Sequence, residues 1–512
     1  MAIYEPTDPR NGHRMYRLRS PVTLEPIGEL ACATAADVQA AMARARTAQP
    51  AWGARSVAER AEYMHRLADL LIAKRDRIID TVIRETGKPR AEALIMEVYS
   101  SVDPCVFYAQ RAAKFLKPER RRLHGVVGLL KKAVVVYKPR GVVAVITPWN
   151  GPFVLSMNPC VQALLAGNAV ILKPSEVTPA SGALVGDFLH EAGIPADVIQ
   201  VVQGDGQTGA DLIAAGPDKV SFTGSVATGR KIAVACGERL IPHTLELGGK
   251  DAMIVCRDAD IDRAAKGALI GSCMNTGQYC CGTERIYVVA DVYAPFVQKV
   301  VAAAKQLRQS DDVDACDVGA TFWDRQLAII EDHVNDAVAK GAHVEVGGRR
   351  NPALKGLYFE PTVLTEVTHD MKIMRDETFG PIVAIMKVKD EDEAVRLAND
   401  SPYGLNGNVW TQDAAKGLRL AARIETGAAS VNDMAMSYAV NEVPFGGVKE
   451  SGVGVVNGPE GLRGYCHAMP IIAQRFGKGP ASSYPYTAKT IRQVTQAMKL
   501  FWGSRFMRRL FG

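Results

Sequence analysis

Short apolar segments alternate with amphipathic segments along most of the chain after residue 133. Ala133–Tyr137 and Val142–Ile146 are rich in β-branched residues, and a turn signal with proline and glycine separates them. Three further apolar segments, Ala169–Leu172, Val198–Val202 and Val220–Phe222, are separated by stretches with helical spacing. Continuous apolar strands joined by helices are typical of a buried parallel sheet, so the sequence predicts an α/β fold.

The pattern differs at the N-terminal end of the chain. The first 120 residues have mostly helical patterning, and Ser56 and Glu59 have the spacing of a capping box that opens a helix. A second α/β series is expected from about 250 to 437, and it includes a strand at Ile382–Met386. We therefore expect helices first and two α/β units after them.

Composition indicates a soluble globular protein with more than one core. The chain has 512 residues, of which 47% are hydrophobic and 23% charged, so two or three domains are expected. Its N-terminus lacks the apolar core of a secretory signal, and no apolar run is long enough for a spanning helix. The ten cysteines have no CxxC pair or zinc-ligand spacing. We expect a reducing, cytoplasmic setting and no metal site.

The net charge of +6 comes from one end of the chain. Residues 478–512 contain seven of the 61 basic residues and none of the 55 acidic ones, which leaves 54 basic against 55 acidic residues elsewhere. A nucleic-acid-binding body would carry a basic face within its fold. The neutral body therefore argues against nucleic acid as a partner.

Residues 484–512 form a distinct basic tail. Aromatic and aliphatic residues recur in it at helical spacing among lysines and arginines. This composition suits a helix lying at the interface of an anionic membrane. The alternative is a helix that packs on the body or on a neighbouring subunit, with its charges solvated. Composition alone leaves both interpretations open.

Two segments could form a phosphate-binding loop. Residues 204–209 match the GxGxxG pattern, but no acidic residue ends a strand about 20 positions later, so a tight turn at a helix start is the better interpretation. Gly224 and Ser225 end an apolar strand just before a helix. Free amides at the helix start and the Ser225 hydroxyl could face a pyrophosphate, and an ordinary helix cap is the alternative.

Lys173, Ser175 and Glu176 follow the apolar strand that ends at Leu172. Nucleotides bind at the carboxyl ends of parallel strands, where a carboxylate can accept hydrogen bonds from ribose hydroxyls. The Glu176 carboxylate would repel a 2′-phosphate and so favours NAD over NADP. Taken alone, a solvated turn is the better explanation of these residues.

Glu246 and Cys280 are the candidates for acid–base and nucleophilic chemistry. Glu246 precedes two glycines, and a poorly solvated glutamate has a raised pKa that suits a general base. Cys280 has Cys281 beside it. A free cysteine is more often a small buried hydrophobe than a nucleophile, unless amides or cations lower the pKa of its thiol.

Seven motifs in one order resemble the aldehyde dehydrogenase superfamily over roughly residues 20–470. They are Pro148–Asn150, Lys173–Glu176, Phe222–Ser225, Glu246–Lys250, Gly277–Cys280, Glu377–Pro381 and Pro444–Gly447. The resemblance implies an NAD(P)-dependent enzyme with a Rossmann-like cofactor domain, an α/β catalytic domain and a small oligomerisation β-element.

The resemblance implies a catalytic role for three residues. Cys280 matches the nucleophile that attacks an aldehyde, and the Asn150 amide with the Cys280 backbone N–H resembles the oxyanion hole. Glu246 resembles the base that activates water. Relatives that pass the acyl group to coenzyme A generally lack this glutamate, so its presence favours a carboxylic acid product. A CoA-acylating enzyme and a membrane-associated, non-catalytic scaffold are the alternatives.

The resemblance also implies the cofactor site. Lys173 and Glu176 match contacts to the adenosine ribose, Ser225 a pyrophosphate contact, Glu377 a contact to the nicotinamide ribose, and Phe379 the aromatic residue beside the nicotinamide. The full set of expected contacts is Trp149, Lys173, Ser175, Glu176, Gly224, Ser225, Glu377 and Phe379. The cofactor is expected to be NAD, with NADP as the alternative.

The family's domain plan can be placed on this chain. It assigns residues 1–120 and 143–246 to the cofactor domain, 247–445 to the catalytic domain, 121–142 and 446–478 to the oligomerisation element, and 479–512 to the basic tail. A homodimer or a homotetramer is expected.

The substrate is expected to be a small-molecule aldehyde. We predict that Phe153, Met157, Met274 and Tyr279 line the tunnel to the nucleophile, and none of them is cationic. An aldehyde with a medium-length, long or aromatic apolar group is therefore favoured over succinate semialdehyde.

Overall fold

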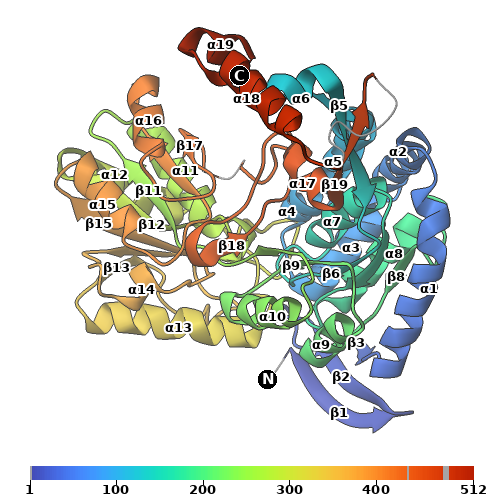
Figure 1. Cartoon of the computed structure of the whole chain (residues 1–512). Helices are drawn as coiled ribbons and strands as arrows, with labels where there is room; N and C mark the ends of the chain where they lie inside the picture. The colour runs from blue at the N-terminus through green and yellow to red at the C-terminus, as the bar shows by residue number, and fades with distance from the viewer. Residues whose placement is uncertain (1–2, 435–436, 477–483, 512) are drawn as a thin grey trace.

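The computed structural model describes residues 3–434, 437–476 and 484–511. Two α/β units lie side by side, with the unit from the first half of the chain on the right of Figure 1 and the later unit on the left. Two small antiparallel sheets and a C-terminal pair of helices, α18 (Ala488–Trp502) and α19 (Arg505–Phe511), complete the described structure.

The first unit is built on a six-stranded sheet with the order β18-β10-β9-β6-β7-β8. Its strands are β6 (Val142–Ile146), β7 (Ala169–Lys173), β8 (Ile199–Val201), β9 (Lys219–Thr223), β10 (His243–Glu246) and β18 (Gly452–Val453). All run parallel except β18, which pairs antiparallel with β10. Every residue of β6 and β7 is buried, which explains why both strands are continuous apolar runs in the sequence.

Helices cover this sheet. They are α1 (Ala35–Gly53), α2 (Val57–Ala73), α3 (Arg75–Thr86), α4 (Arg90–Glu92), the π-helix η1 (Ala93–Tyr99), α5 (Ser100–Phe115), α7 (Val154–Leu165), α8 (Pro179–Glu191), α9 (Gly206–Ala214) and α10 (Val226–Glu238). Ser56 and Glu59 form the predicted capping box at the start of α2.

The second unit contains a seven-stranded sheet with the order β13-β14-β15-β12-β11-β16-β17. Its strands are β11 (Asp251–Val255), β12 (Thr283–Val289), β13 (His343–Val346), β14 (Thr362–Thr365), β15 (Ile382–Val388), β16 (Gly407–Trp410) and β17 (Ser430–Val431). Only β13 is antiparallel to its neighbour. The accompanying helices are α11 (Ile261–Cys273), η2 (Met274–Gly277), α12 (Ala290–Ala304), α13 (Asp324–Ala339), α14 (Lys372–Arg375), α15 (Glu391–Asn399) and α16 (Ala414–Ala421).

A small sheet extends from the first unit. In it β5 (Lys131–Pro139) pairs antiparallel with both β4 (Glu119–Arg121) and β19 (Cys466–Gln474), and the short helix α6 (Gly125–Leu130) connects β4 to β5. Residues 446–478 therefore do not form one element as expected. Within this stretch, β18 joins the six-stranded sheet, whereas β19 belongs to the small sheet. The stretch also contains the short helices η3 (Lys449–Ser451) and α17 (Gly458–Gly464).

The helical prediction was wrong for residues 4–31. They contain an antiparallel sheet of β1 (Tyr4–Arg10), β2 (His13–Arg19) and β3 (Pro26–Ala31). These strands are mostly half-exposed and rich in charged residues, so they lack the apolar runs that mark the buried strands. The backbone N–H of Ile3 donates to Asp324 at 2.9 Å and ties this sheet to the second unit.

Candidate active site

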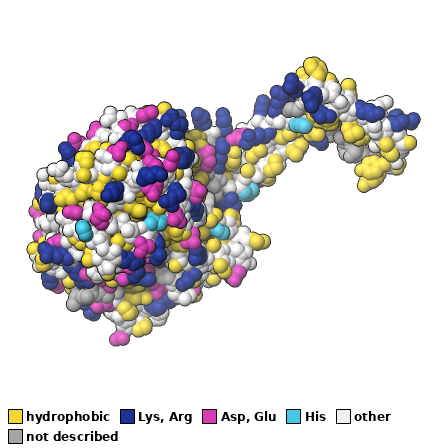
Figure 2. All heavy atoms as spheres, turned by 90° about the vertical axis from the view of Figure 1, so that its left-hand side faces the viewer, with side chains coloured by type: hydrophobic (Ala, Val, Ile, Leu, Met, Phe, Trp, Pro, Cys, Tyr) yellow, Lys and Arg dark blue, Asp and Glu magenta, His cyan; other side chains and the backbone are white. Residues whose placement is uncertain are grey.

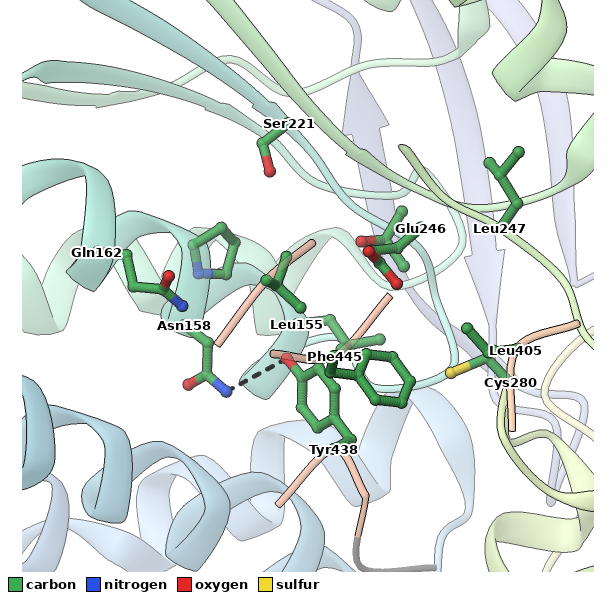
Figure 3. Close-up of a pocket in the computed structure, with 13 residues that line it drawn as sticks. Leu155, Asn158, Gln162, Ser221, Glu246, Leu247, Cys280, Leu405, Tyr438 and Phe445 are labelled. Carbon is green, nitrogen blue, oxygen red and sulfur yellow. Dashed lines mark hydrogen bonds between the residues drawn. The ribbon is translucent and has the colours of Figure 1, made fainter. Parts of the chain in front are cut away.

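A cavity between the two units brings Cys280 and Glu246 together (Figure 3). Its lining consists of apolar and uncharged polar side chains besides these two. The lining residues are Leu155, Asn158, Pro159, Gln162, Ser221, Thr223, Glu246, Leu247, Cys280, Leu405, Tyr438, Phe445 and Val456. Thr223 and Glu246 stand at the carboxyl ends of β9 and β10, and ligands commonly bind at such ends of parallel strands.

Glu246 is the last residue of β10, and its side chain is buried. Neither carboxylate oxygen has a hydrogen-bond partner among the described residues. Burial, followed by the nearby Cys280 thiol, raises the pKa of Glu246 well above its usual value. A raised pKa makes this carboxylate a stronger base than an exposed glutamate, which suits a general base.

Cys280 lies in the loop between η2 and β12, half-buried, whereas Cys281 is fully buried. In Figure 3 the Cys280 sulfur points into the cavity. A hydrogen bond with the Cys281 side chain, and then burial, raise the pKa of the Cys280 thiol. Deprotonation of this thiol therefore needs a base, and Glu246 faces the same cavity.

Asn150, which follows β6, is linked directly to the loop of Cys280. Its Nδ2 donates to the carbonyl oxygen of Gln278 at 3.1 Å, and Asn275 Nδ2 donates to the carbonyl oxygen of Asn150 at 2.9 Å. The structure thus brings together Asn150, Glu246 and Cys280 from loops that are far apart in the sequence. Asn275 and Gln278 are buried partners that sequence reasoning missed, although both lie in the segment just before the nucleophile.

The residues expected to contact the adenosine half of a dinucleotide lie at strand ends. Lys173 Nζ and the Glu176 carboxylate form an ion pair at 3.2 Å, and the Ser175 hydroxyl accepts the Val177 N–H at 3.2 Å. Ser225 caps α10 by accepting the Thr228 N–H at 3.3 Å. The start of α10 therefore offers free backbone amides to an anion.

The loop before α10 passes close to the Phe222 ring. A Cβ on Gly224 would lie 2.5 Å from that ring, so a larger residue would require the ring to shift. The GxGxxG match at residues 204–209 has a different role. Asp205 caps α9 and binds the Arg14 guanidinium at 2.8 Å, so this segment is a helix start, as the sequence predicts.

Glu377 and Phe379 approach the catalytic loops from the second unit. Glu377 accepts the Gly249 N–H at 3.0 Å, and burial together with the neighbouring Glu284 raises the pKa of Glu377 to about 8. Phe379 has a positive φ of 52°, and its ring packs edge-on against Trp149 with centroids 5.6 Å apart. Three of the expected cofactor residues are therefore grouped beside the cavity loops.

Lys250 and Glu284 form a buried ion pair that holds this group. Glu284 accepts the N–H groups of Thr378 and Phe379 at 2.7 and 2.9 Å, and Lys250 Nζ donates to Thr378 Oγ1 at 3.0 Å. Sequence reasoning missed Glu284. The available signal was a lone carboxylate at the start of the apolar strand β12.

The predicted tunnel residues do not line this cavity. Phe153 and Met157 are fully buried, and the Phe153 ring packs against Phe188 at 5.9 Å. The cavity instead meets another face of α7, which carries Leu155 and Asn158. Residues one helical turn apart lie on the same face of a helix. The prediction for Phe153 and Met157 therefore chose the wrong face of α7.

Met274 and Tyr279, also predicted for the tunnel, are not among the residues that line the cavity. Tyr279 instead packs with Cys281 in a small apolar cluster. Of the segment that precedes and includes Cys280, only Cys280 is among the residues that line the cavity.

Residues 8–471 match the sequence model of the aldehyde dehydrogenase family. The chain belongs to that family. The predicted α/β fold, with a Rossmann-like unit and a catalytic unit, and the predicted NAD(P)-dependent oxidoreductase are thereby confirmed. The basic tail lies beyond the matched region.

This aldehyde dehydrogenase is similar to curated proteins over nearly their whole length. It is 42% identical over 470 residues to a putative succinate-semialdehyde dehydrogenase [NADP(+)] 2 of Mycobacterium ulcerans (strain Agy99), covering 91% of this chain and 89% of the relative. It is 38% identical to the 4,4'-diapolycopene aldehyde oxidase of Methylomonas sp, covering 95% of this chain and 91% of the relative.

Solved structures agree with the fold of this aldehyde dehydrogenase. The Mycobacterium tuberculosis aldehyde dehydrogenase complexed with NAD+ superposes with a TM-score of 0.85 at 34% identity, covering 91% of this chain and 95% of that one. The NAD-dependent aldehyde dehydrogenase from Sinorhizobium meliloti gives a TM-score of 0.87 at 32% identity, covering 93% and 94%.

The Lys250–Glu284 pair makes a direct prediction about stability. Glu284→Ala leaves a fully buried ammonium without its carboxylate, and removing one partner of a buried pair costs about 3–5 kcal/mol. We expect a clear fall in the urea midpoint of this aldehyde dehydrogenase. Glu25→Ala is the control, because Glu25 pairs with Lys355 on the exposed surface and should contribute at most about 1 kcal/mol. Equal shifts for both variants would show that the buried pair has no special role.

Proposed function

We propose that this aldehyde dehydrogenase oxidises an apolar aldehyde to its carboxylic acid, with Cys280 as the nucleophile and Glu246 as the base. The observation that carries the proposal is the pair of groups facing one cavity: a cysteine sulfur and a buried carboxylate that no described residue hydrogen-bonds. Burying such a carboxylate is costly, and perturbed acids in cavities are concentrated at functional sites.

In the first step Glu246 accepts the thiol proton, and the Cys280 thiolate attacks the aldehyde carbon. The aldehyde oxygen gains negative charge, which the Asn150 amide and the Cys280 backbone N–H stabilise as an oxyanion hole. One donor of this kind contributes about 3–4 kcal/mol to the transition state. The product of this step is a thiohemiacetal on Cys280.

When bound, the nicotinamide cofactor supplies the acceptor for the hydride lost by the thiohemiacetal carbon. What remains on the protein is a thioester of Cys280. Glu246 first releases the thiol's proton to solvent. It then takes a proton from a water molecule, the water oxygen attacks the thioester carbonyl, and Cys280 leaves as a thiolate. Because this carboxylate is present beside the nucleophile, we favour water over coenzyme A as the acyl acceptor.

The cofactor contacts are proposed on the fit of the residues present. Lys173, Ser175 and Glu176 are assigned to the adenosine half. Gly224 and Ser225, at the amide-rich start of α10, are assigned to the pyrophosphate.

The nicotinamide half is assigned to Trp149, Glu377 and Phe379, which lie together beside the catalytic loops. The Glu176 carboxylate favours NAD. The Lys173 ammonium paired with it, and the NADP(+) in the names of several relatives, keep NADP as the alternative.

An apolar aldehyde is proposed because of the cavity's chemistry. Among the described residues that line it, none is Lys, Arg or His, so the carboxylate of succinate semialdehyde would have no cationic partner. The relative named 4,4'-diapolycopene aldehyde oxidase is in line with a long apolar substrate. Other relatives are named succinate-semialdehyde dehydrogenases, and that aldehyde is therefore the comparison substrate in the kinetic test below.

We predict that Cys280→Ala abolishes aldehyde-dependent NADH formation and that Glu246→Gln lowers kcat by about 10²–10⁴-fold, the range for loss of a general base. Cys316→Ala, a buried cysteine outside the cavity, should behave like the wild type. The wild-type kcat should rise with pH as Glu246 loses its proton at its raised pKa, and Glu246→Gln should lack this rise. An active Cys280→Ala enzyme would refute the assignment.

We predict that kcat/KM for hexanal and benzaldehyde exceeds that for succinate semialdehyde by at least about tenfold, the equivalent of 1.4 kcal/mol. Leu155→Arg would add a cation to the cavity wall and should move the ratio toward succinate semialdehyde. Steady-state kinetics of both proteins test this. A wild-type preference for succinate semialdehyde would overturn the proposed substrate class.

We further propose that the basic tail contacts an anionic membrane. The helix α18 has no buried residue, and a series of apolar side chains on it and on α19 is more than half exposed: Ile491, Val494, Met498, Leu500, Phe506 and Leu510. Figure 2 shows an arm with hydrophobic and basic side chains projecting from the body. No described helix is long and apolar enough to cross a membrane.

The helix α6 adds to the same surface. Its preceding residue His124 stacks on Trp502 with ring centroids 4.5 Å apart, and Val127, Leu129 and Leu130 on α6 are 41–52% exposed. The apolar side chains would enter the interface while the lysines and arginines meet anionic headgroups.

The tail proposal predicts flotation of the full-length protein with vesicles containing phosphatidylserine, and less with phosphatidylcholine alone or at high salt. The double variant Val494→Glu, Met498→Glu should lose binding. A matched control, Val234→Glu, Leu418→Glu, changes equally exposed apolar residues on the body and should still bind. Unchanged flotation of the tail variant would overturn the proposal, and a change in its oligomeric mass instead would indicate that a second copy covers the tail.

A further inference from the structure

Three charged side chains from one short segment lie behind the catalytic loops. They are Lys88, just after α3, Glu92 at the end of α4, and Glu97 in η1. The side chains of Lys88 and Glu97 are fully buried and form an ion pair. None of the three lines the cavity, yet each bonds the backbone of a segment that carries Asn150 or Cys280.

Glu97 anchors the segment that carries Asn150. Its carboxylate accepts the N–H groups of Phe153 and Val154 at 3.1 and 3.0 Å, at the start of α7. That helix has no side-chain cap from its own N-cap residue, so Glu97 supplies the cap from another helix. Lys88 Nζ, paired with Glu97, also donates to the carbonyl oxygen of Asn150 at 3.5 Å.

Glu92 anchors the segment that carries Cys280. Both of its oxygens lie 3.0 Å from the backbone nitrogen of Asn275. Asn275 and Thr276 have φ values of 56° and 58°, in the left-handed region that residues other than glycine rarely adopt. Two such residues in succession need an outside partner to hold them, and Glu92 provides it.

Asn275 joins the two anchored segments. Its Nδ2 donates to the carbonyl oxygens of Asn150 and Gln278 at 2.9 and 2.7 Å. The Gln278 oxygen also accepts Asn150 Nδ2 at 3.1 Å. The orientation of the Asn150 side-chain amide is therefore fixed by a network of hydrogen bonds. Glu92 anchors one end of this network, and Glu97 anchors the other.

The π-helix explains how one segment reaches both loops. Glu92 and Glu97 are five positions apart, which in an α-helix would separate them by roughly 140° around the axis. In η1 the N–H of Ser100 instead bonds the carbonyl of Ile95, the five-residue spacing of a π-helix. This wider turn places residues five positions apart nearer to the same side of the helix. π-helical turns often occur at functional sites.

We propose that Glu92 and Glu97 are positioning residues that aim the Asn150 amide at the oxygen of the substrate. The inference rests on the proposed roles of Asn150 and Cys280. It implies that losing either glutamate slows reactions that place charge on a carbonyl oxygen. Reactions of the Cys280 thiol that form no oxyanion should be little affected.

The test compares two cofactor-free reactions of the full-length enzyme. With p-nitrophenyl acetate the Cys280 sulfur attacks the ester carbonyl, an oxyanion forms, and p-nitrophenolate leaves with the bonding electron pair. With iodoacetamide the same sulfur displaces iodide, and no oxyanion forms. We expect Glu92→Ala to slow acetyl transfer at least tenfold while the alkylation rate of Cys280 stays within twofold of the wild type.

Two further variants complete the design. Glu92→Gln keeps an acceptor for the Asn275 N–H and should recover acetyl transfer to within about threefold of the wild type. Glu62→Ala removes an exposed glutamate of α2 and should change neither rate. Glu97→Ala removes the second anchor and should repeat the pattern of Glu92→Ala.

The outcomes separate this inference from the proposed function. Equal slowing of acetyl transfer and alkylation in Glu92→Ala, or no slowing of either, would overturn the positioning role. Acetyl transfer that persists in Cys280→Ala would instead show that the proposed nucleophile is wrong, whatever Glu92 does.

Discussion

Several charged side chains are buried at the junction of the two α/β units, and the loops around the cavity are arranged to hold them there. The Glu246 carboxylate sits at the end of a buried parallel strand without a hydrogen-bond partner among the described residues, and burial raises its pKa. Burying an ionised carboxylate without a partner costs free energy, and this cost favours the neutral form of the group. The surrounding loops have to be held firmly enough to keep this carboxylate and the Cys280 thiol facing one cavity.

Two buried ion pairs at this junction contrast with Glu246, because their charges are partnered. Lys250 and Glu284 pair with each other and fix the loop of Glu377. Lys88 and Glu97 pair with each other and cap the start of α7. The paired charges hold backbone segments in place. No described residue hydrogen-bonds the carboxylate of Glu246, so this group can exchange protons. The site therefore combines a rigid frame with one reactive acid.

Much of the fold could be predicted because its central strands are buried on both faces. β6 and β7 appear in the sequence as continuous apolar runs, and the motifs at their ends mark Asn150, Lys173 and Glu176. The N-terminal sheet could not be predicted in this way, because its half-exposed strands are as polar as loops. The cavity wall was also missed: the helical phase of α7, which turns Leu155 inward to the cavity and Met157 to the core, is set by tertiary packing.

We propose that Cys280 carries an acyl group that Glu246 helps water to remove. The most direct measurement is the mass of the Cys280 peptide from Glu246→Gln enzyme quenched after mixing with aldehyde and NAD. We expect a mass increase equal to the acyl group, bound to Cys280 and accumulating because hydrolysis is slowed. An unmodified Cys280 peptide while NADH is still formed would contradict it.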